Sequence, residues 1–179
     1  MSSVMYLASD APLTARPNPH ERLVSVNEAL QAGRTDIPDI LLEDGFDRDR
    51  PNVLLLSVRE VSIDVDRGII EDGNFDDDFC FWLTEKWPDM RTEKKYCAFF
   101  EWVKYTRGRA EMVLQYIREQ LEKSDEIEFW HIWMDDQPKH RCNVVEKKIG
   151  DLMAEDIAEL EGKEVWGEPC EDWCYKIKK

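Results

Sequence analysis

Residues 108–134 read GRAEMVLQYIREQLEKSDEIEFWHIWM and combine two hydrophobic patterns with only a short break between them. In the first half, apolar residues recur three or four positions apart, as on one face of an α-helix. These residues are Ala110, Val113, Leu114, Ile117 and Leu121. In the second half, residues 127–134 are apolar on both faces of an extended chain, which is typical of a strand inside a sheet. The stretch therefore predicts a core helix followed by a central strand.

Further strand patterns lie on both sides of this stretch. Short apolar or alternating runs predict strands at residues 4–8, 23–26, 53–65, 79–83, 96–105, 144–149 and 173–177. A short helix is predicted before Gly33 and another at residues 151–160. Strands and helices do not alternate regularly, so we expect an α+β fold with a mainly antiparallel sheet and one or two helices packed on one face. We expect a single domain over residues 1–179.

The acidic residues are concentrated in one quarter of the chain. The formal net charge is −15, and residues 36–78 hold fourteen Asp and Glu residues against four Arg residues, a net of −10. Such a field repels phosphate backbones and anionic lipids, which disfavours nucleic-acid and membrane-surface binding. It favours a basic partner or a divalent cation.

The chain has the sequence features of a cytoplasmic protein. No run approaches the roughly 18–20 apolar residues of a membrane span, and the N-terminus lacks a signal-peptide pattern. Five cysteines, an odd number, are typical of a reducing compartment in which they stay thiols. The glycine loops G-x-G-x-x-G and G-x4-G-K-S/T do not occur in the sequence, which removes the commonest nucleotide-binding motifs.

Cysteine and histidine spacing gives one candidate metal site. His140 with Cys142 and Cys170 with Cys174 form two pairs of soft ligands, which suit tetrahedral zinc. The spacing between the last two cysteines is common in such sites, whereas H-x-C is unusual. The alternative is that these residues are structural or solvent-facing.

The acidic quarter gives a second candidate metal site. Carboxylates that converge from neighbouring strand ends are the ligands that Ca²⁺ or Mg²⁺ uses. The candidates are Asp64, Asp66, Asp76 and Asp78. The segment that begins at Asp64 lacks the central glycine and the final acid of a calcium loop. A solvated run of charges is the alternative.

A catalytic candidate lies on the aromatic strand. His131 stands between two tryptophans, and Asp135 and Asp136 follow it along the chain. In an extended strand His131 and Asp135 share a face, so a general base with an orienting carboxylate is geometrically allowed. No G-x-S-x-G motif accompanies them. The alternative is a histidine packed in the core.

Two motifs, MYLASDAPL at residues 5–13 and the helix that leads into IEFWHIWMDD at residues 108–136, resemble a set of small bacterial proteins of unknown function. Members of that set open with a YLAS/TD-x-PL strand and later run a helix into an aromatic strand that ends in acids. They also carry a cysteine- and glycine-rich stretch before the helix, where this chain has only Cys97. The resemblance implies a bacterial single-domain protein and carries over no activity.

These patterns predict a binding or interaction module that uses an acidic face to attract a basic protein partner. Tryptophans such as Trp82, Trp87 or Trp166 are the candidate anchors. The alternative function is a metal-assisted enzyme that holds a divalent cation near the end of the central strand and uses His131 as its base. Apart from that metal, no cofactor is predicted.

Overall fold

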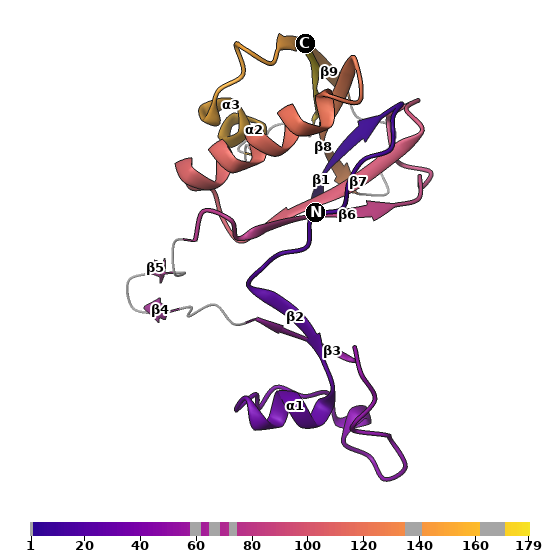
Figure 1. Cartoon of the computed structure of the whole chain (residues 1–179), viewed down its shortest axis with the longest axis vertical. Helices are drawn as coiled ribbons and strands as arrows, with labels where there is room; N and C mark the ends of the chain where they lie inside the picture. The colour runs from indigo at the N-terminus through magenta and orange to yellow at the C-terminus, as the bar shows by residue number, and fades with distance from the viewer. Residues whose placement is uncertain (1, 58–61, 65–68, 72–74, 135–140, 162–170) are drawn as a thin grey trace. The chain divides into compact units, whose positions relative to one another are not determined.

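The computed structural model describes residues 2–57, 62–64, 69–71, 75–134, 141–161 and 171–179 (Figure 1). The chain divides into two compact units, a larger one of Met1–Pro17 with Phe75–Lys179 and a smaller one of Asn18–Asn74. The single domain expected over residues 1–179 stays a prediction.

The larger unit is a six-stranded sheet with two helices. Its strands are β1 (Ser2–Ser9), β6 (Phe79–Thr84), β7 (Tyr96–Trp102), β8 (Glu126–Met134), β9 (Arg141–Lys148) and β10 (Glu171–Lys178). Its helices are α2 (Arg107–Leu121) and α3 (Ala154–Glu161). The strand order is β6-β7-β1-β8-β10-β9, and all neighbours are antiparallel except β9 and β10. The predicted α+β fold with a mainly antiparallel sheet is confirmed.

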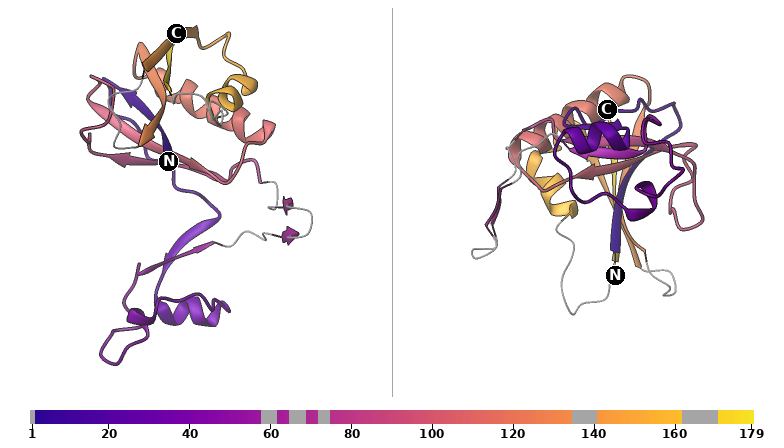
Figure 2. Two further views of the ribbon diagram at one scale, coloured as in Figure 1. Left: turned by 180° about the vertical axis from the view of Figure 1, so that it is seen from behind. Right: turned by 90° about the horizontal axis from the view of Figure 1, so that it is seen from below.

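Strand β8 is central, as its apolar pattern predicts. One face of the sheet carries Ile127 and Phe129, which pack in a core with α2 and α3. Both helices lie on this same side of the sheet (Figure 2). The opposite, helix-free face carries Trp130 and Ile132, which pack in a second core. Both faces of β8 are therefore covered, and this explains why its sequence is almost continuously apolar.

Helix α2 buries its apolar stripe against the sheet. The Thr106 hydroxyl caps the helix by accepting a hydrogen bond from the Arg109 amide, 3.1 Å away. The stripe residues Ala110, Val113, Leu114, Ile117 and Leu121 are all buried. Tyr116 is also buried on α2, and its ring stacks on the ring of Phe81 with the centroids 4.2 Å apart. The helix is thus fixed over β6 by ring stacking as well as by aliphatic packing.

Helix α3 explains the parallel strand pair. Parallel neighbours require the chain to cross from one end of the sheet to the other, and α3 lies in this connection between β9 and β10. The Lys147 ammonium on β9 lies 2.6 Å from the Asp156 carboxylate on α3. This ion pair ties the helix to the edge strand.

The connection between β6 and β7 covers the helix-free face. Residues 85–95, which we call the strap, contain no helix or strand. Met90 of the strap is buried among side chains of the sheet in what we call the strap-side core. The buried members of this core are Tyr6, Ala8, Met90, Cys97, Trp130, Ile132 and Cys174.

The smaller unit has a core of its own. It contains β2 (Glu21–Val24), α1 (Val26–Gln31), a 3-10 turn (Asp39–Leu41), β3 (Leu54–Ser57), β4 (Ser62–Asp64) and β5 (Ile69–Glu71). The buried core residues are Val24, Val26, Ala29, Ile37, Leu54 and Leu56. Helix α1 begins with a capping box between Ser25 and Glu28 and ends before Gly33, whose φ of 84° favours glycine.

The single long strand predicted at residues 53–65 is wrong. The structure has two strands there, and they belong to different sheets, because β3 pairs with β2 whereas β4 pairs with β5. Alternation along the chain shows that a segment is extended but does not identify its partner. No helix in the described ranges is long and apolar enough to cross a membrane.

Candidate functional site

His131 is buried on the helix side of β8. Its side chain is 2% exposed and pairs in register with Trp173 of β10. Its ring packs edge-on against Trp133, with the centroids 5.7 Å apart. This environment matches the packed histidine that was the alternative to a general base. Asp135 and Asp136, the predicted carboxylate partners, lie outside the described residues, so the catalytic arrangement stays a prediction.

The predicted cation ligands are spread over different elements. Asp64 belongs to β4 of the smaller unit, and Asp66 lies outside the described residues. Asp76 and Asp78 belong to the turn before β6 in the larger unit. Asp78 is fully buried, and its Oδ2 lies 3.5 Å from Nη2 of Arg109. Asp78 therefore acts as the counter-ion of a buried arginine.

Arg109 is a structural anchor that the sequence analysis missed. Its side chain is fully buried in the first turn of α2. The guanidinium donates from Nε to the Phe75 carbonyl oxygen at 2.9 Å and from Nη1 to the Lys104 carbonyl oxygen at 3.0 Å. These contacts satisfy a charge that is costly to bury alone. An arginine at the start of a helix gives no sequence signal for such a role.

Asp76 lies against the beginning of α2. A Cβ atom built on Gly108 would be 2.0 Å from Oδ1 of Asp76, so the absence of a side chain at Gly108 makes room for the carboxylate. A negative charge beside the first turn of a helix is favourable, because the helix N-terminus carries partial positive charge. Asp76 thus stabilises the beginning of α2.

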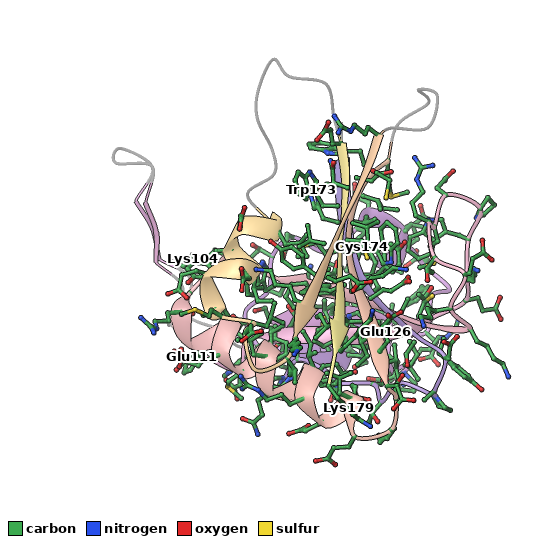
Figure 3. The ribbon with its side chains drawn as sticks, turned by 90° about the horizontal axis from the view of Figure 1, so that it is seen from above. Lys104, Glu111, Glu126, Trp173, Cys174 and Lys179 are labelled. Carbon is green, nitrogen blue, oxygen red and sulfur yellow. The ribbon has the colours of Figure 1, made fainter. Side chains whose placement is uncertain are left out.

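The zinc candidates differ in their surroundings. Cys142 is exposed on β9, whereas Cys174 of β10 is fully buried in the strap-side core. Figure 3 shows Trp173 and Cys174 on opposite sides of β10. Burial raises the pKa of the Cys174 thiol well above its ordinary value, which disfavours the thiolate that binds metal.

The other two zinc candidates, His140 and Cys170, lie outside the described residues. Within the residues that the structure covers, no group of three or more His, Cys, Asp or Glu side chains could hold a metal ion.

The acidic segment presents many exposed carboxylates in the smaller unit. Outside the masked positions, the exposed acids of this unit are Glu28, Asp36, Asp39, Glu43, Asp44, Asp47 and Asp49. The Arg34 guanidinium lies 2.8 Å from Asp36, and it also donates to the Leu55 carbonyl oxygen. The ion pair therefore lies at the edge of β3.

Two exposed leucines lie on the strands of this unit. Leu23 and Leu55 are paired in register across β2 and β3, and their side chains are 55% and 46% exposed. The next pair in register, Val24 and Leu54, faces the opposite side and is buried in the core of the unit. We call Leu23 and Leu55 the leucine pair.

The predicted tryptophan anchors have different environments. Trp82 on β6 is 42% exposed. Trp87 of the strap is half-buried, with its ring edge-on to Tyr6 at a centroid distance of 5.9 Å. Trp166 lies outside the described residues. Trp82 therefore remains as an exposed aromatic side chain on the edge of the sheet.

Buried carboxylates hold the strap on the helix-free face. Nε of Arg91 lies 2.7 Å from Oδ2 of Asp172, a side chain that is fully buried at the start of β10. The Thr92 hydroxyl donates to Oε2 of Glu128 at 2.6 Å, and Nε1 of Trp130 donates to the same oxygen at 2.8 Å. These residues form a polar cluster between the strap and the sheet.

Sequence reasoning missed this cluster. Arg91 and Asp172 are 81 positions apart, and each looks like an ordinary surface charge in its local sequence. The cluster is built when β8 and β10 become neighbours, which no local pattern indicates.

No family model, curated protein or solved structure matches this chain. The function is therefore inferred from the described side chains.

Proposed function

We propose that this protein is a binding module that recognises a basic segment of a partner protein. The acidic face of the smaller unit attracts the segment, and the leucine pair receives its apolar side chains. The observation that carries the proposal is the pairing of Leu23 and Leu55, both about half exposed, on a unit rich in exposed carboxylates.

The leucine pair supports an apolar contact. Its two side chains are neighbours across the strands and form one continuous apolar surface, whereas scattered exposed leucines are common and carry no meaning. Complete burial of a leucine side chain is worth about 1.5–3 kcal/mol, so covering two half-exposed leucines contributes on the order of 2 kcal/mol. That contribution is enough to orient a segment but not to hold it alone.

Charge supports the choice of a basic partner. Residues 36–78 have a net charge of −10 in the sequence. Exposed carboxylates on the same unit as a small apolar contact speed the encounter with a basic segment and repel acidic ones. The same charges make nucleic acid and anionic membranes poor partners.

Fluorescence anisotropy with a labelled peptide of alternating lysine and leucine tests this function. We expect binding that weakens by about tenfold or more between about 50 mM and about 500 mM salt. A peptide with glutamate in place of lysine is expected not to bind. Absence of binding to the lysine peptide at low salt, or binding that salt does not change, would overturn the proposal.

Matched leucine variants locate the surface. Leu23→Ser and Leu55→Ser remove the apolar contact and are expected to weaken peptide binding by about fivefold to tenfold each. Leu83→Ser is the control, because Leu83 is 55% exposed like Leu23 but belongs to the larger unit. Equal weakening by all three variants would contradict the assignment to the leucine pair.

We place this activity in the cytoplasm, supported by the cysteine chemistry. The four cysteines that the structure describes, Cys80, Cys97, Cys142 and Cys174, are all present as thiols. Among the described side chains, no arrangement favours the alternative function, the metal-assisted reaction. It stays a prediction, and metal analysis of the purified protein tests it.

A further inference from the structure

We propose that the strap is a lid that opens as a unit while the six-stranded sheet stays folded. Its opening uncovers Tyr6, Trp130 and the thiols of Cys97 and Cys174. This inference concerns the larger unit and does not depend on the proposed function.

The strap is held mainly by side-chain ties. Arg91 binds Asp172 and Thr92 binds Glu128, as described above. Farther along, the Lys94 ammonium lies 2.7 Å from Asp10 and 3.1 Å from Glu126. The backbone is tied to β1 by a hydrogen bond from the Arg91 amide to the Tyr6 hydroxyl, 3.0 Å long. These ties are independent of the hydrogen-bond ladders that hold the strands together.

The energetics favour separate opening. When an ion pair with a buried carboxylate separates into water, both charges regain hydration, which offsets much of the lost attraction. The apolar contacts of the strap come from two side chains, because Met90 is buried in the strap-side core and Trp87 packs against that core while half-buried. Segments with few buried apolar contacts and no regular structure open at a lower free energy than the sheet beneath them.

The surface beneath the strap is aromatic. The Tyr6 and Trp130 rings stack with their centroids 6.1 Å apart and an interplanar angle of 12°. Burial raises the pKa of the Tyr6 hydroxyl well above its ordinary value. Cys97 and Cys174 lie in the same core, and burial raises the pKa of both thiols. The closed strap thus keeps four reactive or polar groups away from water.

Thiol labelling of the full chain tests the proposal, because the chain carries its own probes. Cys97 and Cys174 lie beneath the strap, Cys80 is 2% exposed but is not a member of the strap-side core, and Cys142 is exposed. The reduced protein is incubated with a maleimide at increasing urea below the unfolding transition. Peptide mapping by mass spectrometry then gives a labelling rate for each cysteine.

A strap that opens separately has a defined signature. Cys97 and Cys174 are expected to react at similar rates, at least about tenfold faster than Cys80 and with a weaker dependence on urea. The exposed Cys142 sets the upper limit of the rate. If Cys97, Cys174 and Cys80 share one rate and one urea dependence, the strap opens only in global unfolding and the proposal is wrong. Fast labelling of just one of the two strap-side thiols would also contradict it.

Variants of the strap separate opening from loss of stability. Arg91→Met removes the tie to Asp172 and is expected to raise the labelling rates of Cys97 and Cys174 about tenfold or more. The rate at Cys80 should stay unchanged. Asp89→Asn, which changes an exposed strap residue, is the control and should leave all rates as they are. An equal rise in the labelling rates of Cys97, Cys174 and Cys80 in Arg91→Met would overturn the proposal that the strap opens as a lid.

Discussion

The guanidinium of Arg109 donates a hydrogen bond from Nε to the carbonyl oxygen of Phe75, 2.9 Å away. Phe75 is the residue at which the chain re-enters the larger unit after the smaller one. Because Arg109 also pairs with Asp78, one buried side chain fastens this re-entry to the first turn of α2. The arrangement gives a buried charged residue a structural role.

Arg109→Met is expected to lower the free energy of unfolding by about 3–5 kcal/mol, because it leaves the buried Asp78 carboxylate without its counter-ion. Urea unfolding followed by tryptophan fluorescence measures the change. The matched control is Arg107→Met, since the Arg107 side chain is 70% exposed, and a change within about 0.5 kcal/mol is expected there. A loss below about 1 kcal/mol for Arg109→Met would show that the anchor is dispensable.

Gly108→Ala is expected to change stability little. Alanine gains about 1 kcal/mol of helix propensity over glycine, but its Cβ displaces the exposed Asp76 carboxylate from the helix N-terminus, where it is worth about 0.3–1 kcal/mol. In an Asp76→Ala background the same change should therefore stabilise α2 by up to about 1 kcal/mol. Urea unfolding of the unaltered protein, the two single variants and the double variant measures the contribution of helix propensity and that of the Asp76 charge. A cost above about 2 kcal/mol for Gly108→Ala alone would mean that Asp76 cannot move.

Glu28 is expected to titrate below its ordinary pKa of 4.5, because its carboxylate accepts a hydrogen bond from the Ser25 amide and is further stabilised by the Ser25 hydroxyl. A pKa that is lower in the folded state stabilises α1 at neutral pH, and this contribution is lost as pH falls through the folded pKa. Side-chain carboxyl chemical shifts measured by NMR give the midpoint. Ser25→Ala keeps the amide donor and removes only the hydroxyl, so it should move the midpoint part of the way back toward 4.5. A midpoint at 4.5 in the unaltered protein would contradict the capping box.

Zinc is expected to leave the thermal midpoint of the reduced protein unchanged. Cys174 is fully buried in an apolar core, and its raised pKa disfavours the thiolate that a zinc site requires. Thermal unfolding with added Zn²⁺ and with a chelator makes the comparison, with Cys142→Ser as the control. A stoichiometric zinc ion whose stabilising effect disappears in Cys174→Ser would contradict this reading.

The sequence predicted the elements of the larger unit well because their patterns are strong. Residues 96–105 fit helical as well as strand spacing, but the clear helical stripe that follows them favours a strand, and the structure has β7 (Tyr96–Trp102) there. The prediction of one long strand at residues 53–65 is wrong because its pattern does not identify the pairing partners. Its two halves are both extended, but their partners, β2 and β5, lie on opposite sides of it in the chain.

The candidate site was less predictable than the fold. The acidic quarter is visible in composition, whereas the leucine pair depends on which faces of β2 and β3 are covered. Trp87 is partly buried because it belongs to the strap, which packs on the helix-free face, whereas Trp82 stays exposed on the edge strand β6. A tryptophan in a sequence does not show whether its own segment will pack against a sheet.

The sequence by itself determined the helix that begins after Thr106 and the central strand β8, because the spacing of apolar side chains dictates which backbone form can bury them together. Only the tertiary structure decided the pairing of Arg91 with Asp172, the parallel pair of β9 and β10, and the burial of Cys174 beside the exposed Cys142. These features join residues that are distant in the chain. These contacts stabilise the protein only after the sheet has assembled, so no local sequence pattern can predict them.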